Sequence, residues 1–219
     1  PAGSSCSVSC TGLANIAESP SNRMANWVVV LDEDAQRREA FGARVARCIA
    51  PLEGLSVSAS AGLGWSLAWA AAPRAPVDVH ADPAGVTACW GEPRDEAGVL
   101  QSAAMIQSAW GRGAVAQWDG YYAAVSLDAA QRSLTVGTDV LGIFPVYYWS
   151  DGRGVVLVGT SAELFREHPS FVRALNPAGL VGILLTNGLV DGETLWQGVR
   201  RLGPGQRLRV VDGKPREEE

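Results

Sequence analysis

Residues 121–158 read YYAAVSLDAAQRSLTVGTDVLGIFPVYYWSDGRGVVLV, and this stretch decides the fold class. It contains four short runs of apolar, aromatic and β-branched residues, which favour strands, and turn residues separate the runs. Consecutive strands joined by short turns pair antiparallel as hairpins. The predicted strand pairs are 121–127 with 134–138, around residues 128–132, and 146–149 with 155–158, around Asp151-Gly152.

Further strands and helices are predicted on both sides of these hairpins. The run Trp27–Leu31 predicts a buried strand, because consecutive valines favour strand over helix. Phe41, Val45 and Ile49 recur at helical spacing and predict a helix over about 34–50. The remaining predictions are strands at 55–60, 65–71, 77–80, 86–90 and about 206–211, and helices at 97–110, 161–167 and 176–186.

The order of these elements predicts one α+β domain. Strands cluster in antiparallel hairpins with helices interspersed, a pattern typical of a layered α+β sandwich and not of alternating βαβ units. The domain is expected to span residues 24–211. Residues 1–23, rich in Ser, Gly, Ala and Pro, are expected to form a flexible extension, and the charged residues 212–219 a frayed tail.

The composition excludes several classes of protein. With 219 residues, of which 47% are hydrophobic, the chain can bury a core and is not disordered as a whole. Its net charge of -5 lacks the basic excess of a nucleic-acid-binding protein. The apolar runs fall short of the roughly 20 residues that a membrane helix needs, and no secretory signal is recognisable. We therefore expect a soluble, cytoplasmic protein without nucleic-acid or membrane partners.

Motifs that carry chemistry are scarce. The four cysteines, at 6, 10, 48 and 89, lack the spacing of a zinc site, so no metal site is expected. The two histidines, His80 and His168, lie far apart in the sequence, and structural or surface roles are expected for both. Phosphate-binding glycine loops, the hydrolase nucleophile elbow and the zinc-protease motif do not occur in the sequence. Residue patterns alone therefore predict a domain without an assigned activity.

Three motifs in the second half of the chain are similar to those of a known family in their residues and their order. They are Trp118-Asp119-Gly120-Tyr121, Asp139-x-Leu141-Gly142-x-x-Pro145 and Gly159-Thr160-Ser161-Ala162-Glu163, followed by the passage from Thr194 to Gln206. In this order they resemble the second half of a class II glutamine amidotransferase domain of the asparagine synthetase superfamily. Residues 24–117 match that family only weakly.

The resemblance implies a four-layer αββα sandwich of two antiparallel sheets, as in N-terminal nucleophile (Ntn) hydrolases. It also assigns motif roles that are mostly structural to Asp119, Gly120, Asp139, Leu141, Gly142, Pro145, Ser161 and Glu163. Local chemistry agrees with such roles. Gly142 and Pro145 can shape a turn whose amides Asp139 caps, and Ser161 can cap a short helix.

The residues that make active members glutaminases are not recognisable. Active members use an N-terminal cysteine as nucleophile, and no cysteine follows Met24 in the first predicted strand. Their oxyanion turn is of the N-G-E type, and its best match is Trp90-Gly91-Glu92, in which tryptophan replaces the donor amide. Active members also use an aspartate that holds the amino group of glutamine, and here that region reads Leu100-Gln101-Ser102-Ala103. The arginine loop by which active members bind the carboxylate of glutamine has no match in this chain. The degenerate turn implies that the glutaminase site is lost.

A domain of this kind without its cysteine resembles the amino-terminal half of β-lactam synthetases and, in Leu141–Trp149 and Leu164–Pro169, of lasso-peptide cyclases. The resemblance implies a structural, substrate-supporting role in an ATP-dependent amide-forming enzyme of peptide natural-product biosynthesis. ATP and Mg are expected only in a separate synthetase domain, whose pyrophosphate loop does not occur before Glu219. The expected partners are that domain or chain and, as a further candidate, a precursor peptide with its maturation protein.

Two alternatives remain open. The segment from Cys10 to Ile16 faintly resembles the start of an active domain, so processing before Cys10 would expose a nucleophile and give an amidotransferase that supplies ammonia. Alternatively, the chain is a stand-alone pseudo-enzyme that docks a partner through exposed aromatic residues such as Trp110 or Trp149.

Overall fold

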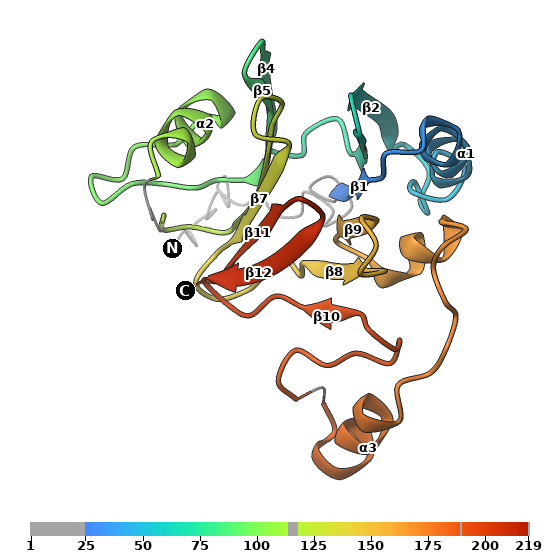
Figure 1. The fold of residues 1–219 in the computed structure, drawn as a ribbon. Helices are drawn as coiled ribbons and strands as arrows, with labels where there is room; N and C mark the ends of the chain where they lie inside the picture. The colour runs from blue at the N-terminus through green and yellow to red at the C-terminus, as the bar shows by residue number, and fades with distance from the viewer. Residues whose placement is uncertain (1–24, 114–117, 189, 219) are drawn as a thin grey trace, which may run out of the picture.

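The computed structural model describes residues 25–113, 118–188 and 190–218, and within them the strands form two six-stranded antiparallel sheets (Figure 1). The strands are β1 (Ala25–Leu31), β2 (Ser56–Gly62), β3 (Trp65–Ala71), β4 (Val77–Asp82), β5 (Gly85–Gly91), β6 (Tyr122–Asp128), β7 (Ser133–Thr138), β8 (Tyr147–Ser150), β9 (Val156–Gly159), β10 (Arg200–Arg201), β11 (Arg207–Val211) and β12 (Lys214–Glu218). The helices are α1 (Ala35–Val45), α2 (Ala103–Gly111), α3 (Pro177–Thr186) and the 3-10 helix η2 (Ala162–Glu167).

Each sheet is built from neighbouring hairpins. The first sheet has the strand order β10-β8-β9-β1-β3-β2, and the second sheet has the order β12-β11-β7-β6-β5-β4. Both hairpins predicted from residues 121–158 are found, β6 with β7 in the second sheet and β8 with β9 in the first. The stretch that decides the fold class therefore supplies two strands to each sheet.

The core lies between the two sheets, because alternate residues of a strand point to opposite faces. On β1, Trp27 and Val29 pack in the central core, whereas Val28 and Val30 pack outward with residues of α1 and η2. On the outer face of the second sheet, Ile106 of α2 packs with residues of β5 and β6. The layers are therefore helix, sheet, sheet and helix, and the predicted α+β sandwich of two antiparallel sheets is confirmed.

Helix α2 begins at Ala103, so the prediction of a helix from residue 97 is wrong at its start. The carboxylate of Asp95 accepts hydrogen bonds from the backbone amides of Ala97 and Val99, at 3.0 and 2.9 Å. These contacts hold the segment in a turn that competes with helix formation. The hydroxyl of Ser102 then caps the helix.

Residues Lys214–Glu218 form strand β12, so the expectation of a frayed tail is wrong. They pair antiparallel with β11. Between the two strands, Asp212 and Gly213 have φ angles of 50° and 70°. An Asp-Gly pair with positive φ at both residues makes the tight turn that matches the twist of a hairpin. This turn returns the charged residues to the edge of the second sheet.

Some expectations fall on residues outside the described part of the chain, which leaves out 1–24, 114–117, 189 and 219. The proposed extension and Cys10 are among them. Within the described residues, no helix is long and apolar enough to cross a membrane. The same residues contain no group of three or more His, Cys, Asp or Glu side chains that could hold a metal ion.

Candidate functional site

Two buried indoles meet where β1 faces the end of β5. The rings of Trp27 and Trp90 stack with their centroids 4.9 Å apart and their planes at 11°. Both side chains are fully buried, and neither indole N–H has a hydrogen-bond partner among the described residues. The fold thus brings together the first strand and the turn that the resemblance assigns to the nucleophile and the oxyanion hole. Apolar rings fill the space between them.

The backbone amides of Gly91 and Glu92 are already used within the fold. The N–H of Gly91 donates to the carbonyl of Pro76 at 2.8 Å, and the N–H of Glu92 donates to the carbonyl of Tyr121 at 2.9 Å. An oxyanion hole needs N–H donors directed at the site where charge develops. Neither amide is free for that purpose in this arrangement. The carboxylate of Glu92 faces the guanidinium of Arg94 at 3.3 Å.

The Asp119-Gly120 motif lies beside the same turn. Gly91 and Gly120 have φ angles of 107° and 96°. A Cβ atom at Gly91 would lie 2.1 Å from the carbonyl oxygen of Tyr121, and one at Gly120 would lie 2.2 Å from that of Glu92. The backbone of Asp119 exchanges two hydrogen bonds of 2.8 Å with that of Arg94. The two motifs therefore form one close backbone crossing, which requires glycine at both positions.

The segment at residues 100–103 serves the start of α2. The side-chain Nε2 of Gln101 donates to the carboxylate of Asp95 at 3.1 Å, and Ser102 is the N-cap. The N–H of Ala103 donates to the carboxylate of Asp78, on β4, at 2.7 Å. An aspartate carboxylate does therefore lie at the start of α2, but it belongs to β4 and accepts a hydrogen bond from the backbone of the helix. Asp78 was not predicted from the sequence, because its partner Ala103 lies on a separate element, 25 positions further along the chain.

The described cysteines are not placed as nucleophiles. Cys89 is buried on the outer face of β5, the face opposite Trp90, and burial raises its pKa well above the usual range. Cys48 lies beyond the end of α1, where partial burial and the nearby charge of Glu167 raise its pKa. A nucleophilic cysteine needs a lowered pKa.

Asp139 organises the loop between β7 and β8. Its side chain is fully buried, and the carboxylate accepts a hydrogen bond from the amide of Leu141 at 2.9 Å. Its backbone carbonyl accepts hydrogen bonds from the amides of Gly142 and Gly205, at 2.9 and 2.8 Å. Gly142 has a positive φ of 62°, and Pro145 lies shortly before β8. The buried carboxylate thus holds a tight turn through hydrogen bonds from backbone amides.

Ser161 and Glu163 connect η2 to the segment around Trp196. The hydroxyl of Ser161 accepts a hydrogen bond from the amide of Glu163 at 3.3 Å. The carboxylate of Glu163 accepts from the indole N–H of Trp196 at 3.0 Å and from Arg166 at 2.6 Å. The hydrogen bond from Arg166 lowers the pKa of Glu163. This network joins two segments that lie well apart in the sequence.

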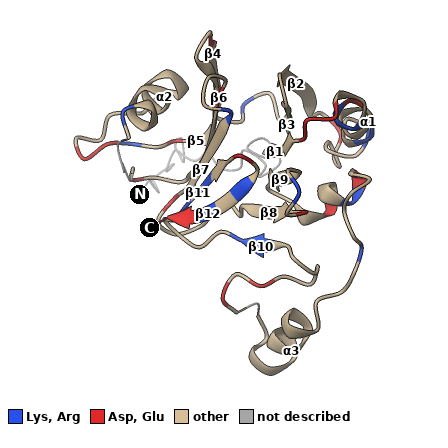
Figure 2. Ribbon diagram, viewed as in Figure 1, with Lys and Arg blue, Asp and Glu red and all other residues tan. Residues whose placement is uncertain are grey.

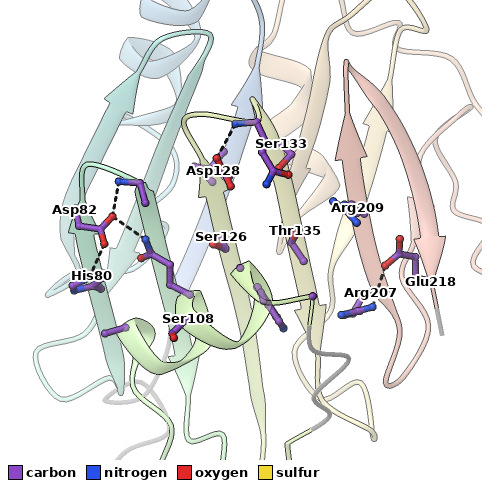
Figure 3. Close-up of a pocket in the computed structure, with 18 residues that line it drawn as sticks. His80, Asp82, Ser108, Ser126, Asp128, Ser133, Thr135, Arg207, Arg209 and Glu218 are labelled. Atoms are coloured by element: carbon purple, nitrogen blue, oxygen red, sulfur yellow. Dashed lines mark hydrogen bonds and ion pairs between the residues drawn. The ribbon is translucent and has the colours of Figure 1, made fainter.

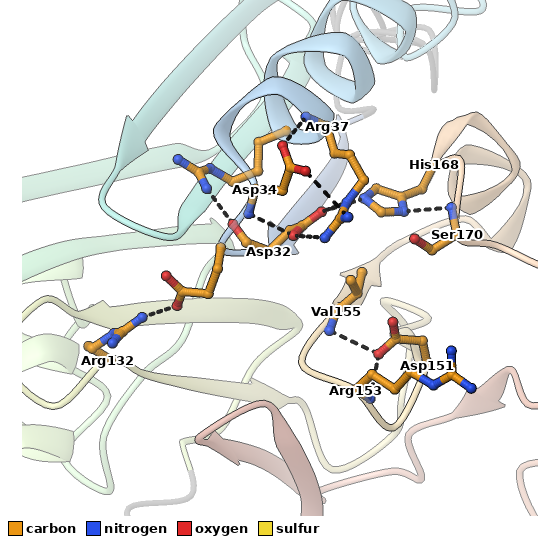
Figure 4. A network of polar contacts seen from close by, with 11 residues as sticks. Asp32, Asp34, Arg37, Arg132, Asp151, Arg153, Val155, His168 and Ser170 are labelled. Carbon is orange, nitrogen blue, oxygen red and sulfur yellow. Dashed lines mark hydrogen bonds and ion pairs between the residues drawn. The ribbon is translucent and has the colours of Figure 1, made fainter.

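A buried Asp–His pair links β1 to η2 (Figure 4). Both side chains are buried, and Nε2 of His168 lies 3.3 Å from Oδ2 of Asp32. Arg37 donates two hydrogen bonds to Asp32, at 2.8 and 2.7 Å, and the amide of Ser170 donates to Nδ1 of His168 at 3.2 Å. Burial raises the pKa of Asp32. The hydrogen bonds from Arg37 and from the Asp34 amide lower this pKa by a larger amount together, so the net shift is downward. Burial lowers the pKa of His168.

The comparisons with known proteins agree with the fold. A family model described as a glutamine amidotransferase domain matches residues 99–219. No curated protein matches the chain. The B. subtilis glutamine phosphoribosylpyrophosphate amidotransferase, solved with ADP and GMP, is similar in structure with a TM-score of 0.50 and 10% identity, over 90% of this chain and 49% of that one.

A structure of the allosteric regulatory enzyme of purine biosynthesis gives a TM-score of 0.49 at 10% identity, over 90% of this chain and 49% of that one. The chain thus spans about half the length of the solved structures that it matches. At such low identity the B. subtilis structure supports the fold alone. The family model covers more than half of the sequence, and the chain therefore belongs to the glutamine amidotransferase domain family.

Proposed function

We propose that this chain is a catalytically inactive glutaminase-like domain of an asparagine-synthetase-like, ATP-dependent amide-forming enzyme. Its role is structural and substrate-supporting, and the parent reaction is macrolactam formation in peptide natural-product biosynthesis of the lasso type. The stack of Trp27 on Trp90 carries the proposal, because it fills the position where the resemblance expects a nucleophile and an oxyanion donor.

Three chemical arguments at the indole pair support the proposed loss of glutamine hydrolysis. An indole carbon or N–H is not a nucleophile toward an amide. The backbone amides of Gly91 and Glu92 are hydrogen-bonded to carbonyl oxygens. These hydrogen bonds would have to break before either amide could stabilise an oxyanion. Separating two stacked, fully buried rings would forfeit both the burial of two large side chains and the stacking itself, which adds about 0.5–1.5 kcal/mol.

Helix α3 supports the partner part of the proposal. No residue from Asn176 to Val190 is charged. Four large apolar side chains of the helix are exposed: Leu180 by 44%, Val181 by 52%, Leu184 by 73% and Leu185 by 80%. We call these four residues the α3 surface. In Figure 1 the helix stands apart from both sheets at the end of long connecting segments.

The α3 surface is expected to pack against a partner. A ten-residue helix has marginal stability in water without packing, and exposed apolar patches mark interaction sites. The start of α3 is attached to this domain. A Cβ atom at Gly179 would lie 2.2 Å from the carbonyl oxygen of Thr194, so the backbones touch there. We assign the synthetase domain or chain of the same enzyme as the partner that packs on the α3 surface, with ATP and Mg bound in that partner.

Calorimetric titration of the purified chain with ATP and Mg tests the proposal. We expect no heat of binding from the chain alone. Saturable ATP binding by these residues would contradict the assignment of the nucleotide to a separate domain. Trp149 does not support the alternative of a stand-alone binding module. Its side chain is 5% exposed and packs edge-on against Phe171, so Trp149 offers no docking surface.

A further inference from the structure

The outer face of the β11–β12 hairpin carries a cluster of cations. The register pairs Arg209 with Arg216 and Val211 with Lys214. Leu208 and Val210 of β11 point into the core, so the alternate residues of β11 and their partners on β12 point outward. Figure 2 shows these basic residues on the two strands. We call Arg209, Lys214 and Arg216 the hairpin cations.

The hairpin cations have no ionic partner among the described residues, although the chain as a whole has a net charge of -5. All three side chains belong to exposed residues. Arg209 and Arg216 stand directly opposite each other across the two strands, an arrangement of like charges that destabilises a sheet. A bound anion would relieve this repulsion.

Two hollows meet at these residues. A hollow of about 340 Å³ is lined by Arg209, Lys214 and Arg216, together with Val211, Asp212 and Glu218. A groove of about 450 Å³ between the hairpin and α2 shares Arg209 and Glu218 with it. Figure 3 shows the groove floor with Ser126 and Thr135 between the hairpin and the far wall at His80 and Asp82.

The carboxylate on the far wall of the groove is held by hydrogen bonds within the fold and does not pair with the hairpin cations. The carboxylate of Asp82 already accepts hydrogen bonds from the amides of Ala84 and Gly85 and from the side chain of Gln107, at 2.8, 3.1 and 2.9 Å. Glu218 pairs with Arg207 at 3.1 Å. The carboxylates of Asp82 and Glu218 are therefore engaged within the fold, whereas the three hairpin cations have no ionic partner among the described residues.

We propose that this face of the second sheet binds an acidic peptide segment in an extended conformation. Residues two apart on a strand lie about 7 Å apart on one face, and acidic residues at alternate positions of an extended peptide have the same spacing. Guanidinium groups bind carboxylates through two parallel hydrogen bonds. Ser126 and Thr135 line the adjoining groove, and their hydroxyl groups can form hydrogen bonds with a peptide backbone. The proposal does not depend on the loss of glutaminase activity.

Fluorescence anisotropy of the full chain tests this site with a labelled decapeptide of alternating Asp and Ser. We expect saturable binding that weakens with salt, and no binding of the matched peptide with Asn in place of Asp. The double variant Arg209→Glu/Arg216→Glu should weaken binding at least about tenfold, since two attractions become repulsions. Arg47→Glu, one such charge reversal at an exposed residue that follows α1, is the control and should leave binding within about twofold.

Several results would overturn the proposal. Equal weakening by Arg47→Glu would reduce the effect to net charge. Displacement of the peptide by millimolar inorganic phosphate at constant ionic strength would identify a small-anion site instead. Absence of binding together with aggregation of the double variant would mean that the cations only protect the edge of the sheet. If the double variant does not fold, Arg209→Gln/Arg216→Gln removes the charges without adding new ones and tests the same point.

Discussion

The indole of Trp27 stacks on that of Trp90 across the interface of the two sheets, with the ring centroids 4.9 Å apart. The contact joins β1 of the first sheet to the end of β5 in the second sheet. It therefore has two consequences, one for the stability of the sandwich and one for the chemistry that the domain can perform.

Truncation of either indole should destabilise the domain strongly. Trp27→Ala removes a fully buried ring and leaves a cavity between the sheets, at a cost of about 3–5 kcal/mol. Urea denaturation followed by circular dichroism measures the free energy of unfolding. Leu63→Ala, at a residue that is 84% exposed, is the control and should stay within about 0.5 kcal/mol of wild type. A small effect of Trp27→Ala would show that the stack does not hold the sheets together.

Asp139 should act through its charge on the loop that it caps. Asp139→Asn keeps the shape of the side chain but weakens its hydrogen bonds to backbone amides, so we expect a loss of about 1.5–3 kcal/mol. Asp191→Asn, at an exposed position with a φ of 52° that asparagine tolerates, should be nearly neutral. Equal stabilities of the two variants in urea denaturation would contradict the capping role.

The buried pair Asp32 and His168 should make the stability depend on pH. The pKa of His168 is near 6.5 in the unfolded chain and lower in the folded chain. Just below pH 6.5 the unfolded chain therefore binds a proton at His168 more readily than the folded chain does. The free energy of unfolding therefore falls as pH drops below about 6.5. The lowered pKa of Asp32 adds stability that is complete above about 3.8 and is lost as pH falls further.

Unfolding measured from pH 7.5 to 4.5 in wild type and in His168→Gln tests this dependence. The variant should lose the decline below pH 6.5, whatever its overall stability. His80→Gln is the control, because His80 is partly exposed and pairs with Asp82 at 3.5 Å on the other sheet. If His168→Gln and wild type decline in parallel, the titrating group lies elsewhere.

Substitutions on the α3 surface should separate docking from folding. Leu184→Glu/Leu185→Glu changes two side chains that this domain leaves exposed, so the free energy of unfolding should change by less than about 0.5 kcal/mol per residue. The binding of an apolar fluorescent dye should fall, because the patch is lost. Gly179→Ala, by contrast, should disturb the attachment of α3 through its clash with the Thr194 carbonyl. A large loss of stability in the double variant would show that the surface packs within the chain.

Elements with strong local signals were predictable from the sequence. Strand β3 and helix α3 occupy residues 65–71 and 177–186, close to their predicted ranges, because turn residues bound the strand and an Asn-Pro cap marks the helix start. Strand β12 was missed although Asp212-Gly213 is a hairpin signal, since its charged composition outweighed the turn in the prediction. The start of α2 was missed because a side chain, Asp95, decides it.

The candidate site was predictable only as a set of separate positions. The turn at Trp90 and the first strand were singled out independently, but their stacking depends on which faces of two sheets meet. The Asp32–His168 pair was not foreseen, because α1 and η2 bring together residues that are distant in the sequence. The hairpin cations were likewise hidden, since only the register of β11 with β12 places Arg209 opposite Arg216.

Ammonia release from glutamine by the purified full chain tests the central claim most directly. We predict no release above the rate of a heat-denatured control, with residues 1–9 intact by N-terminal sequencing. Glutamine hydrolysis that depends on Cys10, shown by its loss in Cys10→Ala, would contradict the claim that this domain is an inactive member of its family.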